Sequence, residues 1–217
     1  MAKVNLGILD GFSGKVGTVV GYSRYNRKWM RAYVDTIQNP RTGAQRLVRA
    51  KFRLLNAVGC GLLPAVQVGL APAALKSHNT PANMFMRRNW ERVTGASPEE
   101  VAVGYASLTL AEGHLPKPAF AQASFAESQK VSCTFTAHSG QPGATDNDLV
   151  YLYVYQAGSN SGVLSAPVSR SAGRASVDVP SEWIGLEVHV YGFAVGDGAD
   201  NKGERSNSAY LGSGTIG

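Results

Sequence analysis

Residues 149–155 read LVYLYVY, and this stretch decides the class of fold. Successive side chains of an extended strand point to opposite faces of its sheet. The stretch therefore has an aromatic face and an aliphatic face, made of Leu149, Tyr151, Tyr153 and Tyr155 and of Val150, Leu152 and Val154. This alternation predicts a β-strand with apolar side chains on both faces.

Further strand-like runs follow the Ser97-Pro98 turn and are separated by turn residues. Besides 149–156, the expected strands are 103–110, 119–126, 131–137, 163–168, 175–179, 186–195 and 208–211. Seven or eight short strands within the last 120 residues are typical of an immunoglobulin-like antiparallel β-sandwich. The chain has two cysteines, Cys60 and Cys133, so the disulfide of an antibody domain is absent, and we expect Cys133 to be a small core residue.

The first half of the chain reads differently. Glycine-punctuated β structure, including a hairpin with a polar tip at 23–28, is expected over the first 37 residues. Helices are expected from Asn39 to about Val58 and over 80–93, where Thr80 is the cap and Pro81 the first residue, and a short helix or turn is expected over 62–69. The expected apolar face of the first helix, which Lys51 interrupts, consists of Ala44, Leu47, Val48, Phe52, Leu55 and Val58. The fold class is therefore α+β and mostly β, with an N-terminal β-hairpin plus helices followed by the sandwich. We expect two domains, residues 1–97 and 98–217.

The start of the first helix has two candidate signals. Asn39 is a suitable N-cap, with Pro40 in the first turn. Thr42 and Gln45 form a competing capping box three residues later. The sequence alone leaves both open.

The two halves carry opposite charge. Residues 1–95 hold 15 Lys and Arg against 3 Asp and Glu, a net of +12. Residues 96–217 hold 6 against 12, a net of −6, and the halves together give the +6 of the whole chain. The basic half should be drawn to nucleic acid, to an acidic protein partner or to the acidic half of a neighbouring copy.

Eight basic residues of this half are the candidate site. They lie on the expected hairpin and on one side of the first helix: Arg24, Arg27, Lys28, Arg31, Arg41, Arg46, Arg49 and Arg53. Tyr22, Tyr25, Trp29 and Tyr33 interleave with the first of these charges, as aromatics do on surfaces that stack nucleic-acid bases. A protein-binding surface and a solvated helix face are the other two interpretations.

Patterns for other chemistry are weak. The stretch GKVGTVVG (14–21) lacks the Lys-Ser/Thr pair of a phosphate-binding loop, so a β-turn is expected there. Clustered oxygens in DGADNKGE (197–204) allow calcium, although a hairpin loop is the stronger interpretation. Of the four histidines, His138 and His189 are expected on the solvent side of strands. We therefore expect no enzyme activity, no cofactor and no metal site.

No secretory signal or membrane span is evident in the sequence. Residues 1–10 contain one Lys and no sustained apolar run. The apolar stretch 58–75 contains Gln67 and two prolines, and it could pack internally or against another chain. A soluble protein made in the cytoplasm, without a membrane partner, is expected.

Three stretches resemble a known protein family. They are GILDGFSGKVGTVVG (7–21), NPRTGAQRLVRAKF (39–52) and SNSAYLG (206–212). The chain is similar to small proteins of Bacteroidota and their mobile elements that have an N-terminal GFSGKVG motif and an NPRT motif. Asp10 departs from that pattern, which has a small residue at this position. The resemblance implies no catalytic residues.

These patterns lead to an expected role. The main hypothesis is a non-enzymatic structural protein of a large assembly, a phage or phage-derived virion, that binds other structural proteins and copies of itself. Its basic half would dock and its sandwich would be displayed. The alternative is a nucleic-acid-binding protein that uses residues 22–53. A third hypothesis is a carbohydrate-binding module that uses Tyr151, Tyr153 and Tyr155.

Overall fold

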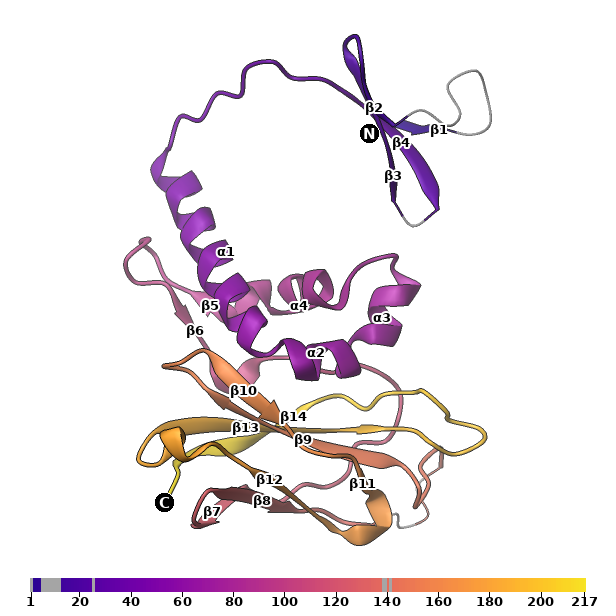
Figure 1. Ribbon diagram of the computed structural model, residues 1–217, viewed down its shortest axis with the longest axis vertical. Helices are drawn as coiled ribbons and strands as arrows, with labels where there is room; N and C mark the ends of the chain where they lie inside the picture. Colours follow the sequence, from indigo (N-terminus) through magenta and orange to yellow (C-terminus); the bar gives the residue numbers. More distant parts are fainter. Residues whose placement is uncertain (1, 5–12, 25, 138–139, 141) are drawn as a thin grey trace. The chain divides into compact units, whose positions relative to one another are not determined.

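The chain folds into two compact units, Met1–Thr42 and Gly43–Gly217, which we call the N-terminal and C-terminal units. The computed structural model, shown in Figure 1, describes residues 2–4, 13–24, 26–137, 140 and 142–217. The expectations for Asp10, Tyr25 and His138 lie outside the described residues. The chain mixes helix and strand, with more strand than helix and several antiparallel sheets, as the expected α+β class requires.

The N-terminal unit is built on one antiparallel sheet with the order β1-β4-β3-β2. Its strands are β1 (Ala2–Val4), β2 (Gly14–Val16), β3 (Val19–Arg24) and β4 (Arg27–Ala32). Gly17 has a φ of 57°, a left-handed conformation that suits glycine, in the tight turn between β2 and β3. The prediction of a β-turn rather than a phosphate-binding loop in GKVGTVVG is confirmed.

The C-terminal unit begins with four helices. They are α1 (Gly43–Gly61), α2 (Leu63–Gly69), α3 (Ala71–Lys76) and α4 (Pro81–Asn89). Proline occupies the first turn of α2, α3 and α4, where a missing N–H costs nothing. Thr80 caps α4 as predicted, since its side chain accepts a hydrogen bond from the Asn83 backbone N–H at 3.2 Å.

Helix α1 begins directly after Thr42, at the second of the two predicted starts. The Asn39-Pro40 start is wrong. Arg41 has a φ of 50°, and this left-handed backbone interrupts any helix between Pro40 and Gly43.

Two antiparallel sheets follow. The first has the order β10-β9-β13-β14, with β11 also paired to β9, and the second has the order β12-β8-β7. The strands of the first are β9 (Leu149–Gln156), β10 (Ser161–Leu164), β11 (Val168–Ser169), β13 (Glu187–Val195) and β14 (Ala209–Thr215). Those of the second are β7 (Ser124–Glu127), β8 (Lys130–Thr134) and β12 (Arg174–Asp178).

Smaller elements complete this unit. A short hairpin pairs β5 (Val93–Thr94) with β6 (Ala102–Val103). The 3₁₀ helices are η1 (Trp90–Arg92), η2 (Tyr105–Ser107), η3 (Arg170–Ala172) and η4 (Ser181–Trp183).

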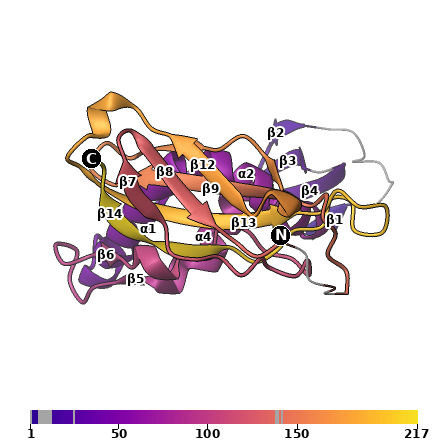
Figure 2. The ribbon, with the colours of Figure 1, turned by 90° about the horizontal axis from the view of Figure 1, so that it is seen from below.

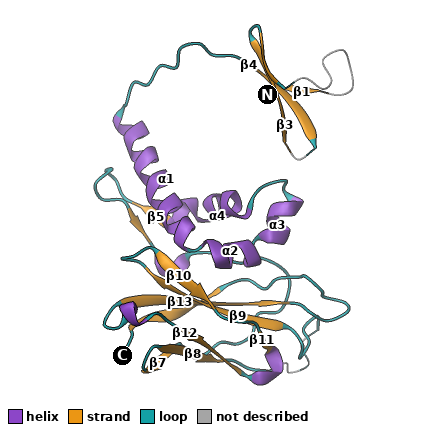
Figure 3. Cartoon of the chain, viewed as in Figure 1, coloured by secondary structure: helices purple, strands orange, loops and turns teal. Residues whose placement is uncertain are grey.

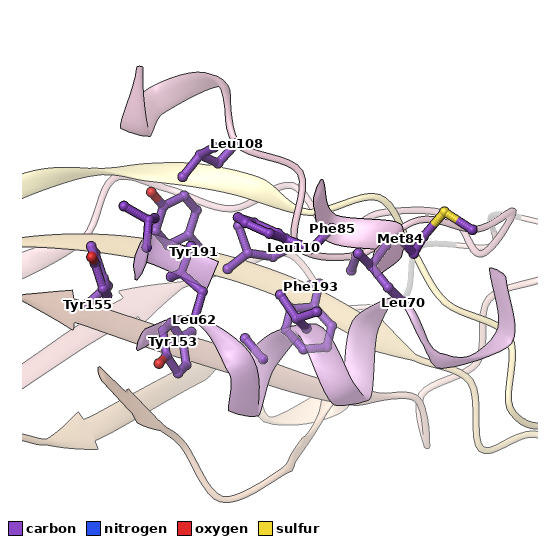
Figure 4. Close-up of a cluster of buried hydrophobic side chains, with 14 of the residues drawn as sticks. Leu62, Leu70, Met84, Phe85, Leu108, Leu110, Tyr153, Tyr155, Tyr191 and Phe193 are labelled. Atoms are coloured by element: carbon purple, nitrogen blue, oxygen red, sulfur yellow. The ribbon is translucent and has the colours of Figure 1, made fainter. Parts of the chain in front are cut away.

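Strand β9 is buried on both faces, which explains the composition of LVYLYVY. Its aliphatic side chains, such as Leu152, lie in a core between the two sheets. Its aromatic side chains, such as Tyr153, lie in a second core between the first sheet and the helices (Figure 4). The C-terminal unit therefore has three layers, with helices, first sheet and second sheet in that order (Figures 1 and 3). Figure 2 shows the same sheets from the side of β7, β8 and β12.

The structure divides the chain at residues 42 and 43, not at the expected boundary between 97 and 98. The helices belong with the later strands because they cover the aromatic face of the first sheet. Leu62, between α1 and α2, and Phe85 from α4 share one buried cluster with Tyr191 and Phe193 from β13. The net charge changes near residue 96 because the composition of the surface changes there. The buried core contains residues from both sides of this position.

The expected strand over 103–110 is wrong for most of its length. Only Ala102–Val103 is strand, followed by η2 and an extended segment. The buried side chain of Asn89 takes the place of a strand partner: its amide donates to the Thr109 carbonyl at 2.9 Å and accepts from the Thr109 N–H at 2.7 Å. The polar groups of this segment are thus satisfied without a ladder.

Candidate partner interface in the basic N-terminal half

The eight predicted basic residues fall into two sets, one in each unit. The N-terminal unit holds Arg24, Arg27, Lys28, Arg31 and Arg41, and helix α1 holds Arg46, Arg49 and Arg53. All eight are exposed.

Strand register gathers most of the first set on one face of the small sheet. Tyr22 pairs with Trp29 across β3 and β4, Arg24 pairs with Arg27, and Val20 pairs with Arg31. Residues paired in this way point to the same side, and alternation along each strand puts all of them on one face. Lys15 of β2 pairs with Val20 of β3 and therefore lies on the same face. We name this surface the cationic aromatic face: Lys15, Val20, Tyr22, Arg24, Arg27, Trp29 and Arg31.

The edge of this surface carries a cation–π contact. The Lys15 Nζ lies 3.4 Å from the centre of the Tyr33 ring. The Tyr33 backbone N–H donates to the Thr18 carbonyl at 2.8 Å, which holds the ring beside β2. Tyr22 and Trp29 are half-buried at the middle of the face, between arginines. This arrangement suits a partner that carries both negative charge and flat apolar groups.

The opposite face of the same sheet combines small apolar side chains with Lys28, which pairs with Ser23 and so lies away from the other predicted cations of β3 and β4. Its residues include Val16, Val19 and Met30, and Val16 is 62% exposed. Neither buried hydrophobic cluster of the protein contains a described residue from this unit. A small sheet that leaves apolar side chains in water gains stability when another surface covers it.

Helix α1 presents the second set. Leu55 and Val58, near its C-terminal end, are buried, as the sequence predicted for its apolar face. Val48 and Phe52 were expected on that buried face but are 52% and 55% exposed, because the first turns of α1 extend beyond the other helices (Figure 1). Lys51, which broke the apolar pattern, is half-buried.

One groove on α1 is lined by both charged and apolar side chains. Its volume is about 600 Å³, and its lining combines Val48 and Phe52 with Arg49 and Arg53. Like the small sheet, this surface would accept a partner that is acidic and partly apolar.

The acidic loop 197–204 connects β13 and β14, as a hairpin interpretation predicts. The buried side chain of Asn201 bonds within the protein: it donates to the Gly143 carbonyl at 3.0 Å and to the Asp148 carboxylate at 2.9 Å, and it accepts from the Gly198 N–H at 2.8 Å. Within the described part of the chain, no group of three or more His, Cys, Asp or Glu side chains is arranged to hold a metal ion.

Two expectations about aromatic and histidine side chains are wrong. Tyr153 and Tyr155 are 0% and 1% exposed under the helices, so they cannot bind a carbohydrate at the surface. His189 is half-buried, not on the solvent side. Its ring stacks on Tyr105 with centroids 4.4 Å apart, and its Nδ1 lies 3.0 Å from the Tyr210 hydroxyl. Burial lowers the pKa of His189, and the Glu187 charge offsets only part of this effect.

The apolar run 58–75 belongs mostly to the core. Val58, Leu62, Val66 and Leu70 are buried against the first sheet, whereas Leu75 is 76% exposed. No single helix among the described residues is long and apolar enough to cross a membrane. The pair α1 and α2, bent by 81°, meets the criterion by length and composition only.

Fold and surface together define a two-part protein, with a small basic sheet joined to a three-layered unit of helices and two antiparallel sheets. The chain belongs to the family of unknown function DUF6266, whose model matches residues 11–212. The match spans both units, so the small sheet and the three-layered unit occur together in that family's pattern. No curated protein matches the chain.

Proposed function

We propose that this protein is a non-enzymatic structural component of a large assembly, a phage or phage-derived virion. It is made in the cytoplasm, docks through its basic N-terminal half onto other structural proteins and copies of itself, and displays its strand-rich part. The observation that carries this proposal is the small sheet of the N-terminal unit, which has a cationic aromatic face and exposed apolar side chains on its other face, and none of whose described residues belongs to a buried hydrophobic cluster.

Charge indicates the kind of partner. Residues 1–42 hold seven Lys and Arg against two Asp and Glu, whereas residues 43–217 hold 14 against 13. A partner of opposite charge would be attracted to the N-terminal unit over several ångströms and oriented before contact. Aromatic and arginine side chains, which dominate protein interfaces, are both present on its cationic aromatic face.

We further propose that the two sheets form an immunoglobulin-like sandwich for display. The support is a core of aliphatic side chains from β8 and β12 facing those of β9 and β13. The helices on the outer face of the first sheet are an addition to such a sandwich, and they leave the second sheet as its open side.

The protonation state of the buried thiol, Cys133, supports the proposal that the protein is not an enzyme. Burial raises the pKa of Cys133 to about 11, and its Sγ–H donates to the Ala121 carbonyl at 3.2 Å. A thiol in this state stays protonated at neutral pH and is a poor nucleophile.

Gradient sedimentation of a nuclease-treated lysate from the native source tests the proposal. The full chain should migrate in a fast-sedimenting particle, and a variant without residues 1–42 should remain at the top of the gradient. Recovery of the full chain as a slow, free species after nuclease treatment would overturn the assembly proposal.

A second candidate is binding to single-stranded nucleic acid, favoured by the pairing of Tyr22 and Trp29 between arginines. Affinity for an oligonucleotide should then fall steeply with added salt. Trp29→Ala and the double change Arg27→Glu/Arg31→Glu should each weaken binding. The double change should also make the affinity depend less steeply on salt concentration. Lys117→Glu/Lys202→Glu, which changes the charge equally on the other unit, is the matched control. No binding at low salt would eliminate this candidate.

A further inference from the structure

The C-terminal unit contains a pocket that is separate from both basic surfaces described above. Its volume is about 460 Å³, and it is lined by residues of α3, α4 and the segments 112–114 and 204–207. Pro72 and Ala73 contribute apolar surface, and Lys76, Arg87, Arg88 and Arg205 contribute positive charge. The pocket therefore joins an apolar wall to four cationic side chains from three parts of the chain.

Two of these cations have partners that hold them in place. Arg88 forms a two-pronged ion pair with Glu112, in which Nε and Nη2 each lie 2.6 Å from a carboxylate oxygen. The Arg205 Nε donates to the Val68 carbonyl at 2.7 Å, and its Nη1 donates to the Gly203 carbonyl. These bonds to backbone oxygens orient the Arg205 guanidinium without neutralising its charge, and Glu204 adds a second carboxylate to the pocket lining beside Glu112.

The other two cations have no acidic partner in the described part of the chain. Within the described residues, neither Lys76 nor Arg87 forms an ion pair or a side-chain hydrogen bond. Lys76 lies at the end of α3 and Arg87 in the last turn of α4, so they approach the pocket from different helices. Asn207 adds a donor to the pocket. Its Oδ1 accepts from the Gly113 N–H at 3.3 Å, which leaves its amide NH₂ without a hydrogen-bond partner among the described residues.

We propose that this pocket binds the phosphoryl group of a phosphate monoester, with Lys76 and Arg87 as its main ligands and the organic group against Pro72 and Ala73. A tetrahedral phosphoryl group has three terminal oxygens that accept hydrogen bonds from several directions. Donors from two helices and from the segment 204–207 line the pocket, so they can reach a group with three terminal oxygens from several directions, which a planar carboxylate with two oxygens would use less fully. The site is independent of the proposed docking function, and either can fail without the other.

Isothermal titration calorimetry of the full chain, at constant ionic strength, tests the site with three probes. Phenyl phosphate is the monoester, inorganic phosphate lacks the apolar body, and benzoate replaces the phosphoryl group with a carboxylate. Saturable binding of phenyl phosphate is expected, with benzoate much weaker. Tighter binding of phenyl phosphate than of inorganic phosphate would identify an ester as the ligand, and equal affinity would identify free phosphate as sufficient.

The variants are Lys76→Gln/Arg87→Gln and, as a control with the same loss of charge, Lys117→Gln/Lys202→Gln. All four positions are exposed, so both variants should fold, which equal thermal unfolding temperatures would verify. The first pair should weaken phenyl phosphate binding at least about tenfold, since it removes two charge-assisted hydrogen bonds, and the control should not. No saturable binding, equal binding of benzoate, or an equal loss in the control would overturn the proposal.

Discussion

The hydroxyl of Tyr153, on β9, donates a hydrogen bond to the backbone carbonyl of Gly61 at the end of helix α1. The two residues are 92 positions apart, and the bond is buried. A second link runs beside it: the Tyr155 hydroxyl donates to the Asn160 side chain at 2.8 Å, whose amide donates to the Ala57 carbonyl at 2.7 Å. The end of α1 is thus attached to the first sheet by polar as well as apolar contacts.

Replacing Tyr153 with Phe should lower the free energy of unfolding by about 1–3 kcal/mol, because it leaves the buried Gly61 carbonyl without its donor. Urea unfolding followed by fluorescence measures the change. Tyr151→Phe is the matched control, since the Tyr151 hydroxyl has no hydrogen bond among the described residues and its loss should have little effect. Equal losses in the two variants would contradict the assignment.

Asp148 and Arg170 form a buried ion pair whose side chains are 0% and 2% exposed, with Arg170 Nη1 3.4 Å from the Asp148 carboxylate. Thr145 donates to the same carboxylate through its N–H at 2.9 Å and its hydroxyl at 2.8 Å. Asp148→Asn leaves a charged arginine without its counter-ion, so we expect a loss of about 3–5 kcal/mol in unfolding free energy. Asp146→Asn, at an exposed neighbouring position, should change stability by no more than about 0.5 kcal/mol.

The same carboxylate should make stability depend on acid pH. Burial alone would raise the pKa of Asp148, but the hydrogen bonds from Thr145 and Asn201 and the charge of Arg170 outweigh it and lower the pKa. The contribution is complete above the unfolded-state pKa of about 3.9 and is lost as pH falls through the folded-state value. Urea unfolding between pH 5 and pH 2 should show a steeper loss in the parent protein than in Asp148→Asn, and parallel curves would contradict this.

His189 should give a separate dependence nearer neutrality. Burial lowers the pKa of this imidazole, so the unfolded chain binds its proton more readily than the folded chain does. The unfolding free energy should therefore fall as pH decreases through about 6.5, the unfolded-state pKa, and level off below the folded-state value. His189→Gln should reduce the slope between pH 7 and pH 5 in urea unfolding, and an unchanged slope would show that another group is responsible.

Local patterns were enough to predict several elements. Thr80-Pro81 indicated the start of α4, and the alternation in 149–156 matched β9 residue for residue. The charges of the candidate site are exposed as expected, and the pairing of Tyr22 with Trp29 agrees with the predicted hairpin. Each of these features depends on residues that are close in sequence.

The arrangement of layers depends on residues that are far apart. Alternation along β9 shows that both faces are apolar, but it does not show that helices cover the tyrosine face. The sequence did contain an indication that something covers the tyrosine face. A sandwich with water on the outside of each sheet would not place four large side chains, one leucine and three tyrosines, on one outer face. The pocket near Lys76 and Arg87 was missed for a similar reason, since its lining comes from segments between residues 72 and 207.

Two truncations test the domain boundary directly. A chain of residues 43–217 keeps both buried clusters intact and should unfold cooperatively, with a midpoint within a few degrees of the full chain, because no described residue of the N-terminal unit belongs to either cluster. A chain of residues 98–217 loses α1–α4 and leaves Tyr153, Tyr191 and Phe193 in water, so it should aggregate or bind a hydrophobic dye. Calorimetry and dye fluorescence distinguish the two cases. A cooperative, dye-free 98–217 chain would show that the second core is sufficient and that the helices are an independent domain.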